Sequence, residues 1–300
     1  MRLMRTTSGR GQAPPLLTRH PCFSEDASKH FGRIHLPVAP KCNISCNYCS
    51  RKYDCANESR PGVISEILLP EEAETRLEQA LKAMPYISTV GIAGPGDSLA
   101  NPEKTFYTLE LVRGMSASLH LCLSTNGLML ADYADELLRL KVGYITVTIN
   151  STDVAIAEKI YRWVRFRGKN YYGKEGASLL LERQREGLLK LKGKGIFLKI
   201  NSLYIPGIND SHIETVARQV KELGAHLVNI MPLIPAPGSA FEKIKRPEEA
   251  DLSRMQDIVG GEIETMKHCR QCRSDAAGML KDTSCKLQVA SKTHSLISVT

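Results

Sequence analysis

At 300 residues and 42% hydrophobic side chains, the chain is long enough to bury the core of one large domain. Its apolar runs fall short of the roughly 18 consecutive residues that a membrane-spanning helix needs, so we expect no membrane partner. The formal net charge of +8 does not by itself indicate nucleic acid, because no zinc-finger, ribonucleoprotein or helix-turn-helix motif accompanies it.

The predicted elements begin after an N-terminal stretch, residues 1–19, whose Gly, Pro, Ser and Thr content predicts a flexible arm. From Arg33 onward, short β-rich runs alternate with segments of helical period, which indicates a parallel sheet built from βα units. The expected strands are Arg33 to Val38, Ile87 to Ala93, Leu119 to Ser124, Tyr144 to Ile149, Ile196 to Tyr204 and Leu227 to Pro232. The expected helices are Pro70 to Ala83, Pro102 to Met115, Tyr133 to Leu140, Leu179 to Leu191, Ser211 to Leu223 and Pro247 to Lys267.

Six βα units are too few for a closed eight-stranded barrel but enough for an open one. The sequence therefore predicts an α/β fold, a partial (βα)6 TIM-like barrel, in one domain over residues 20–282, followed by a C-terminal tail at 283–300. Enzymes of this kind carry their chemistry at the C-terminal ends of the strands, where polar loops such as GPGDSL and STNG lie in this sequence.

Cys42, Cys46 and Cys49 form a C-x-x-x-C-x-x-C motif directly after the first expected strand. Three thiolates on one loop can hold an iron-sulfur cluster and leave one iron open, whereas clusters that only carry electrons are usually closed by four thiolates. Structural zinc is a weaker alternative, because it normally uses two separated pairs and four ligands. Disulfides are not expected, since no secretion signal is present and reduced, cytoplasmic thiols are the default.

With aromatic Tyr48 before its last cysteine, the motif resembles the signature of the radical S-adenosylmethionine (SAM) superfamily. That resemblance implies that the open iron chelates SAM and that an electron from the cluster cleaves the sulfonium to a 5'-deoxyadenosyl radical. The expected SAM-binding residues are Tyr48, Gly94, Asp97, Asn126, Thr148, Asn150, Asn201 and Ile200. The alternatives are loop residues that bond their own backbone and, for the isoleucine, plain core.

Six further cysteines are unusual in a cytoplasmic protein. Cys269 and Cys272 form a C-x-x-C pair, and Cys22 near the other end of the chain offers a third thiolate. Cys122 lies in an expected strand, where a small buried hydrophobe is the usual role; if it points inward, it can share an iron site with Cys55. His20, His30 and His35 compete for the third position of that site, and His35 alone lies inside a strand.

The motifs HPCF, CNISCNYCSRKYDCANESRPGV, GIAGPGDSLAN, CLSTNG and CRQCRSDAAG together closely resemble the NifB family of nitrogenase cofactor biosynthesis proteins, from about residue 20 to 282. The resemblance implies three 4Fe-4S clusters: the SAM cluster on Cys42, Cys46 and Cys49, one substrate cluster on His35, Cys55 and Cys122, and a second on Cys22, Cys269 and Cys272. Cys285 matches no motif.

The same resemblance implies the reaction and the partners. One SAM donates a methyl group to a cluster sulfide and a second supplies the radical, so that two substrate clusters fuse around a carbide, with an added sulfur, into an eight-iron product. Glu58 and Arg60 are candidates for proton handling, with a surface ion pair as the alternative. Cluster donor proteins, an electron donor and a carrier or scaffold protein are the implied partners of a stand-alone form.

Two rival interpretations stay open at this point. One is a radical SAM enzyme with permanent auxiliary clusters that acts on a nucleotide or peptide. The other is a metal-binding module without catalysis. The basic segments RWVRFRGKNYYGK and LLKLKGKG are either solvated surface or sites for anionic clusters and acidic proteins.

Overall fold

The computed structural model describes residues 19–57 and 59–281. The expected tail, Glu58, Cys285 and all but the last residue of the expected arm lie outside the described residues. None of the described helices combines the length and apolar character needed to cross a membrane.

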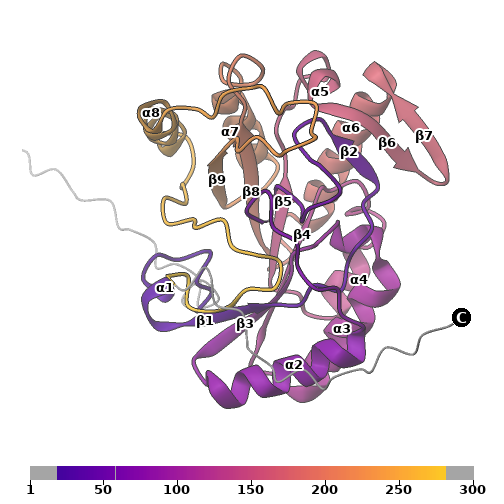
Figure 1. Cartoon of the computed structure of the whole chain (residues 1–300), viewed down its shortest axis with the longest axis vertical. Helices are drawn as coiled ribbons and strands as arrows, with labels where there is room; N and C mark the ends of the chain where they lie inside the picture. The colour runs from indigo at the N-terminus through magenta and orange to yellow at the C-terminus, as the bar shows by residue number, and fades with distance from the viewer. Residues whose placement is uncertain (1–18, 58, 282–300) are drawn as a thin grey trace, which may run out of the picture.

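The predicted partial barrel is confirmed (Figure 1). A seven-stranded sheet has the order β10-β1-β3-β4-β5-β8-β9, and all its neighbouring strands are parallel except β10 and β1. The strands are β1 (Gly32–His35), β3 (Ile87–Ile92), β4 (His120–Thr125), β5 (Tyr144–Thr148), β8 (Phe197–Tyr204), β9 (Leu227–Pro232) and β10 (Ala277–Gly278). The sheet curls so that one face lines the barrel interior and the other packs against helices.

Helices cover the outer face, and their starts follow ordinary capping chemistry. The helices are α1 (Ala27–His30), α2 (Pro70–Ala83), α3 (Pro102–Met115), α4 (Ala134–Arg139), α5 (Val154–Ile160), α6 (Gly173–Leu191), α7 (Ile213–Glu222) and α8 (Glu249–Gly260), with the 3-10 turn η2 (Ser98–Ala100) before α3. Proline opens α2 and α3, where the missing N–H removes no helical hydrogen bond. The Glu72 carboxylate also accepts a hydrogen bond from the Leu69 backbone N–H at 2.7 Å.

The structure differs from the prediction in several elements. Helices α1 and α5 and strand β10 were not predicted, and β1 ends at His35, before the predicted Val38. α6 begins at Gly173, before the predicted Leu179, because the chain turns into it directly from a strand. α8 ends at Gly260, well before the predicted Lys267: the pair Gly260 and Gly261 disfavours helix, and Thr265 pairs with β9 instead. A three-stranded sheet with the order β2-β6-β7 was not predicted, and it comprises β2 (Ile44–Cys46), β6 (Tyr161–Phe166) and β7 (Lys169–Tyr172).

The barrel interior is polar, unlike the packed apolar interior of a closed barrel. Paired residues on neighbouring strands share a face of the sheet, so the strand register defines rows of side chains. The rows are His35, Gly91 and Cys122; Ser124, Thr146 and Lys199; and Thr148, Asn201 and Asn229. The alternate positions, such as Leu198 and Ile200, are fully buried in the core between sheet and helices.

Candidate metal centre

The C-x-x-x-C-x-x-C motif lines a cavity of about 480 Å³, counting its open mouth, at the C-terminal end of the sheet. Cys42, Cys46, Cys49 and Cys55 all line it, and we call it the loop cavity. Burial raises the pKa of Cys42 to about 12, with Asp97 acting in the same direction, and it also raises the pKa values of Cys46 and Cys49. The thiols therefore stay protonated without metal, and iron binding must displace a proton from each.

The GPGD loop packs directly on the three-cysteine loop. Gly96 donates its backbone N–H to the Ala39 carbonyl at 2.6 Å, and a Cβ at Gly96 would lie 2.1 Å from the Lys41 carbonyl oxygen. Only glycine allows this approach. Gly94 instead faces the C-terminal segment, because its Cβ would lie 2.8 Å from Ser274 Oγ, and it does not line the loop cavity.

Asp97 lines the loop cavity and also anchors the neighbouring strand end. Its carboxylate accepts hydrogen bonds from Thr125 Oγ1 and from the backbone N–H of Leu99, Ala100 and Asn126. Burial raises the pKa of Asp97, and these hydrogen bonds oppose the shift. Asn126, held in this way, donates to Asn43 at 2.7 Å beside the three-cysteine loop.

The remaining expected SAM-binding residues are not all in one place. Asn126 and Thr148 line the loop cavity, whereas Asn201 lines the cavity below it and donates to the Asn57 carbonyl at 3.0 Å. Tyr48 and Asn150 line neither cavity: Tyr48 Oη donates to Asn57 Oδ1 at 2.6 Å and accepts from Asn150 Nδ2 at 2.8 Å. Ile200 lies on the helix-facing side of β8.

A second cavity of about 700 Å³, counting its mouth, lies inside the barrel. His35 and four cysteines from four parts of the chain line it, and we call it the barrel cavity; the cysteines are Cys22, Cys122, Cys269 and Cys272. Asn57 and Ser124 line both cavities, which therefore share a wall. Cys55 lines only the loop cavity, although the sequence grouped it with His35 and Cys122.

His35, Gly91 and Cys122 lie side by side on β1, β3 and β4. Two strand spacings, about 10 Å, separate the outer two residues. A Cβ at Gly91 would lie 3.2 Å from His35 Cδ2 and 3.9 Å from Cys122 Cβ, so the glycine leaves an open slot between an imidazole and a thiol.

Hydrogen bonds distinguish the three histidines. His35 Nδ1 lies 3.1 Å from the Arg273 carbonyl oxygen, which can only accept, so Nδ1 carries the proton and Nε2 is bare. His20 Nδ1 instead accepts from the Cys22 backbone N–H at 3.1 Å, which puts the proton on Nε2. Burial lowers the pKa of both rings, that of His35 to about 4. His30 is exposed on α1. His35 is therefore the ring suited to ligate metal.

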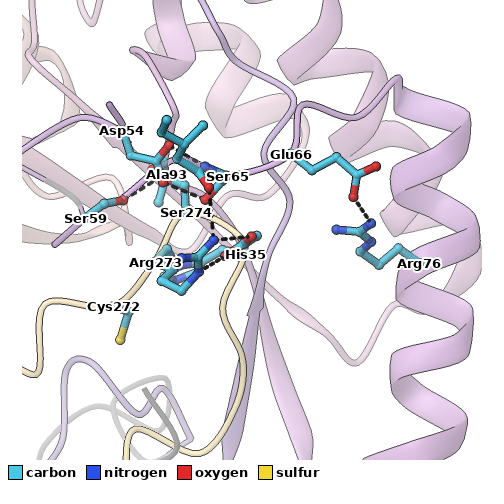
Figure 2. A network of polar contacts seen from close by, with 12 residues as sticks. His35, Asp54, Ser59, Ser65, Glu66, Arg76, Ala93, Cys272, Arg273 and Ser274 are labelled. Atoms are coloured by element: carbon cyan, nitrogen blue, oxygen red, sulfur yellow. Dashed lines mark hydrogen bonds and ion pairs between the residues drawn. The ribbon is translucent and has the colours of Figure 1, made fainter. Parts of the chain in front are cut away.

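The C-terminal segment closes the barrel cavity through a polar network around His35 (Figure 2). Ser274 Oγ donates to the Ala93 carbonyl at 3.0 Å and lies 2.5 Å from Ser59 Oγ. The Arg60 backbone N–H donates to the Cys272 carbonyl at 3.1 Å, but the Arg60 side chain is exposed and lines neither cavity.

The barrel cavity is positively charged. Arg33, Lys199 and Arg270 line it, and no Asp or Glu does so among the described residues. Lys199 is 7% exposed, its Nζ lies 4.8 Å from the centre of the Phe23 ring, and no carboxylate of residues 19–57 or 59–281 lies within 4.0 Å of it. Arg33, 1% exposed, donates from Nη2 to Cys272 Sγ at 2.9 Å.

The donors of the barrel cavity suit iron-sulfur clusters. His20 Nε2, Arg33 Nε and Gln271 Nε2 are buried nitrogens without a hydrogen-bond partner in the described structure, and cluster sulfides accept hydrogen bonds. Within residues 19–57 and 59–281, no three His, Cys, Asp or Glu side chains converge on one point as ligands of a single ion do. The His and Cys side chains of the barrel cavity surround an open space instead.

Comparison with known proteins decides the family. The Radical SAM superfamily profile matches residues 36–220. FeMo cofactor biosynthesis protein NifB of Bradyrhizobium diazoefficiens is 51% identical over 281 residues, 91% of this chain and 56% of that protein. The NifB protein of Chlorobaculum tepidum is 48% identical, over 88% of this chain and 62% of that protein. The NifB protein of Klebsiella pneumoniae is 51% identical, over 87% of this chain and 57% of that protein. The chain belongs to the radical SAM superfamily, and over most of its length it is similar to these NifB proteins.

Solved structures agree with the fold of this chain. Methylornithine synthase (PylB) superposes with a TM-score of 0.50 at 12% identity, over 80% of this chain and 65% of that chain. Native anSMEcpe with bound AdoMet superposes with a TM-score of 0.50 at 15% sequence identity, over 79% of this chain and 63% of that chain. At such identities the likeness concerns the fold alone. The chain spans between about half and three fifths of the length of its curated NifB relatives.

Four residues of the site were not predicted from the sequence: Asn57 and Ser124, which line both cavities, and the buried cations Arg33 and Lys199. The cations carried a readable signal: each stands inside a strand, at an inward position of the alternating pattern. Asn57 carried none, because its position depends on how a loop folds over the barrel.

We predict that the three histidines separate by iron content. After anaerobic reconstitution, His35→Ala should hold about four irons fewer per chain than wild type, since one 4Fe-4S cluster loses a ligand. The matched variants His20→Ala and His30→Ala should keep the wild-type iron content. A loss in His20→Ala with none in His35→Ala would reverse the assignment; iron analysis against protein concentration measures all three.

Proposed function

We propose that this chain is a radical SAM enzyme that assembles the iron-sulfur precursor of the nitrogenase cofactor, and that residues 20–282 form its single working domain. The observation that carries the proposal is the pair of cavities with a common wall. One is lined by the three thiols of the motif and by Cys55, and the other by four thiols, two imidazoles and cations that have no carboxylate partner in the described structure. Cleavage of SAM in one cavity thus places the product radical next to substrate in the other.

In the loop cavity, Cys42, Cys46 and Cys49 would hold the 4Fe-4S cluster that supplies the electron for SAM cleavage. Of the residues expected to bind SAM, Asp97, Asn126 and Thr148 line this cavity. The Asp97 carboxylate is occupied by protein donors, so its role is to hold Asn126 in position. Tyr48 and Asn150 support the three-cysteine loop from behind, and Gly94 allows the C-terminal segment to pack closely.

The barrel cavity would hold the two substrate clusters. His35 and Cys122, with Cys55 from the adjoining loop, are the proposed ligands of one cluster, and Cys22, Cys269 and Cys272 those of the other. The substrates would fuse into an eight-iron product around a carbide derived from a SAM methyl group, with one added sulfur. The Arg60 backbone lies beside Cys272, and Glu58 and Arg60 are the residues proposed to move protons to or from the substrate.

Cluster donors, an electron donor and a carrier or scaffold protein are the proposed partners. Iron-sulfur clusters with thiolate ligands are anionic, and the charge of the barrel cavity matches such cargo. Charge complementarity of this kind also accelerates delivery, because it steers an anionic cargo toward the opening.

We predict that Lys199 helps to hold the iron-sulfur clusters in the barrel cavity and does not stabilise the fold. A buried cation without a carboxylate is destabilising, so Lys199→Met should raise the thermal midpoint of the metal-free protein by at least about 2 °C. The same change should lower the iron retained in the barrel cavity, while Lys199→Arg keeps it. Differential scanning fluorimetry and iron analysis measure both effects.

The control for this prediction is Lys194→Met, which removes an exposed lysine just before the same strand. A Lys199→Met protein with full iron content and a lowered midpoint would show that Lys199 is structural.

We predict that cysteine variants divide the reaction between the cavities. Cys42→Ala should abolish 5'-deoxyadenosine formation from SAM under dithionite, because the cleaving cluster is lost. Cys272→Ala should still cleave SAM but yield no eight-iron product. Chromatographic assay of deoxyadenosine and electron paramagnetic resonance of the clusters measure the two functions.

Equal loss of SAM cleavage in both variants would contradict the division. Iron content that is unchanged before and after turnover in wild type would support an enzyme with permanent auxiliary clusters instead.

A further inference from the structure

The basic segment between Lys159 and Lys174 has no part in either cavity. Its sixteen residues contain six Lys or Arg and no Asp or Glu. Residues 161–172 of this segment form the hairpin β6–β7, and Lys174 is the second residue of α6. The two-residue turn of the hairpin has positive φ at Arg167 (49°) and Gly168 (81°), as a type I′ turn requires. The hairpin projects beside β2 at one side of the barrel (Figure 1).

The hairpin is joined directly to the three-cysteine loop. β2, which contains Cys46, pairs antiparallel with β6, and the Arg165 backbone N–H donates to the Asn43 carbonyl at 2.7 Å. On the other side of the motif, Asn47 Nδ2 donates to the Lys159 carbonyl at 2.8 Å. The proposed SAM cluster therefore sits on the edge strand of a sheet whose other two strands are basic.

The outer face of this sheet runs from the loop cavity to the surface. Ser45, Trp163 and Tyr172 form one cross-strand row: Ser45 lines the loop cavity, Trp163 is half-buried and Tyr172 is 60% exposed. The opposite face is anchored by fully buried Val164 in a core shared with α6. A protein bound over Trp163 on the outer face would thus lie one strand away from Ser45, which lines the loop cavity.

Three exposed cations of the basic segment have no carboxylate partner in the described structure. Arg162, Arg165 and Lys174 are exposed and have no carboxylate within 4.0 Å in the described part of the chain. Two other cations already have partners. The Arg167 guanidinium lies 3.9 Å from the Asp132 carboxylate and 5.1 Å from the Phe166 ring centre. Lys169 Nζ lies 3.8 Å from the Glu175 carboxylate and 4.5 Å from the Tyr171 ring centre. The charges of Arg162, Arg165 and Lys174 are left to attract a partner of opposite charge.

We propose that the outer face of the β2–β6–β7 sheet is the docking site of an acidic one-electron carrier protein. This rests on the proposed function, since each SAM cleaved needs one electron from outside. The donor loses one electron, the cluster in the loop cavity gains it, and no atom is transferred. Electron transfer slows steeply with distance, which favours this face because it borders the loop cavity and not the barrel cavity, where cluster cargo enters.

The test compares charge reversal on the hairpin with the same reversal elsewhere. The triple variant R162E/R165E/K174E removes three unpaired, exposed cations, and K29E/K194E/R254E removes three exposed cations away from the hairpin. Both change the net charge equally. SAM cleavage is driven either by dithionite or by a reduced acidic 4Fe-4S ferredoxin at low salt.

We expect the hairpin variant to keep the dithionite-driven rate within twofold of wild type and to lose at least tenfold of the ferredoxin-driven rate. The control variant should keep both rates. Equal ferredoxin-driven rates in the hairpin variant and wild type would overturn the proposal, and so would an equal loss with dithionite. Wild type that cleaves no SAM with dithionite would instead mean that the proposed function fails.

Binding can be followed independently of activity, because Trp163 is the chain's single tryptophan and lies on the proposed face. Oxidised ferredoxin should quench the tryptophan fluorescence of the reconstituted wild-type and control proteins saturably, and added salt should reverse the effect. The hairpin variant should show at least tenfold weaker binding. Tighter binding of polyuridylate RNA than of ferredoxin at the same salt would overturn the proposal in favour of a nucleic-acid surface.

Discussion

A polar barrel interior is the constraint on which the rest of this structure depends. Lys199, Thr146 and Asn201 point inward where a packed barrel carries Val, Ile or Leu. A buried lysine without a carboxylate costs free energy in the folded protein, and so do buried nitrogens without partners. An anionic group with sulfide acceptors inside the barrel would offset both costs. Such an occupant of the space inside the barrel would therefore stabilise the folded protein.

The two ends of the described chain close that space. The Arg33 guanidinium on β1 donates to the carbonyl oxygens of Gly278 and Met279 as well as to Cys272 Sγ, so a single buried side chain holds the C-terminal segment against the first strand. Cys22 enters the same cavity from the N-terminal side. Figure 1 shows both segments beside β1. The thiols far apart in sequence therefore meet because β10 pairs with β1.

The sequence was sufficient for the six parallel strands of the barrel, because alternation and flanking turn residues are local properties. The family resemblance named Cys22, Cys122, Cys269 and Cys272 as cluster ligands, and all four line the barrel cavity. The sequence did not reveal which way loop side chains point: Tyr48 and Asn150 face each other behind the three-cysteine loop. Ile200 follows inward Lys199 by one position, so strict period-2 reasoning from that lysine would have placed it on the helix side. The β6–β7 hairpin was hidden because its Arg and Lys content resembles ordinary surface.

The most direct measurement is iron-edge anomalous diffraction from anaerobically grown crystals of the reconstituted protein. The account predicts one anomalous peak beside Cys42, Cys46 and Cys49 and two more inside the barrel, near His35 and near Cys272, with Lys199 facing the inner pair. Iron confined to the three-cysteine loop, with the barrel cavity filled by solvent, or a lone zinc ion at that loop would contradict it.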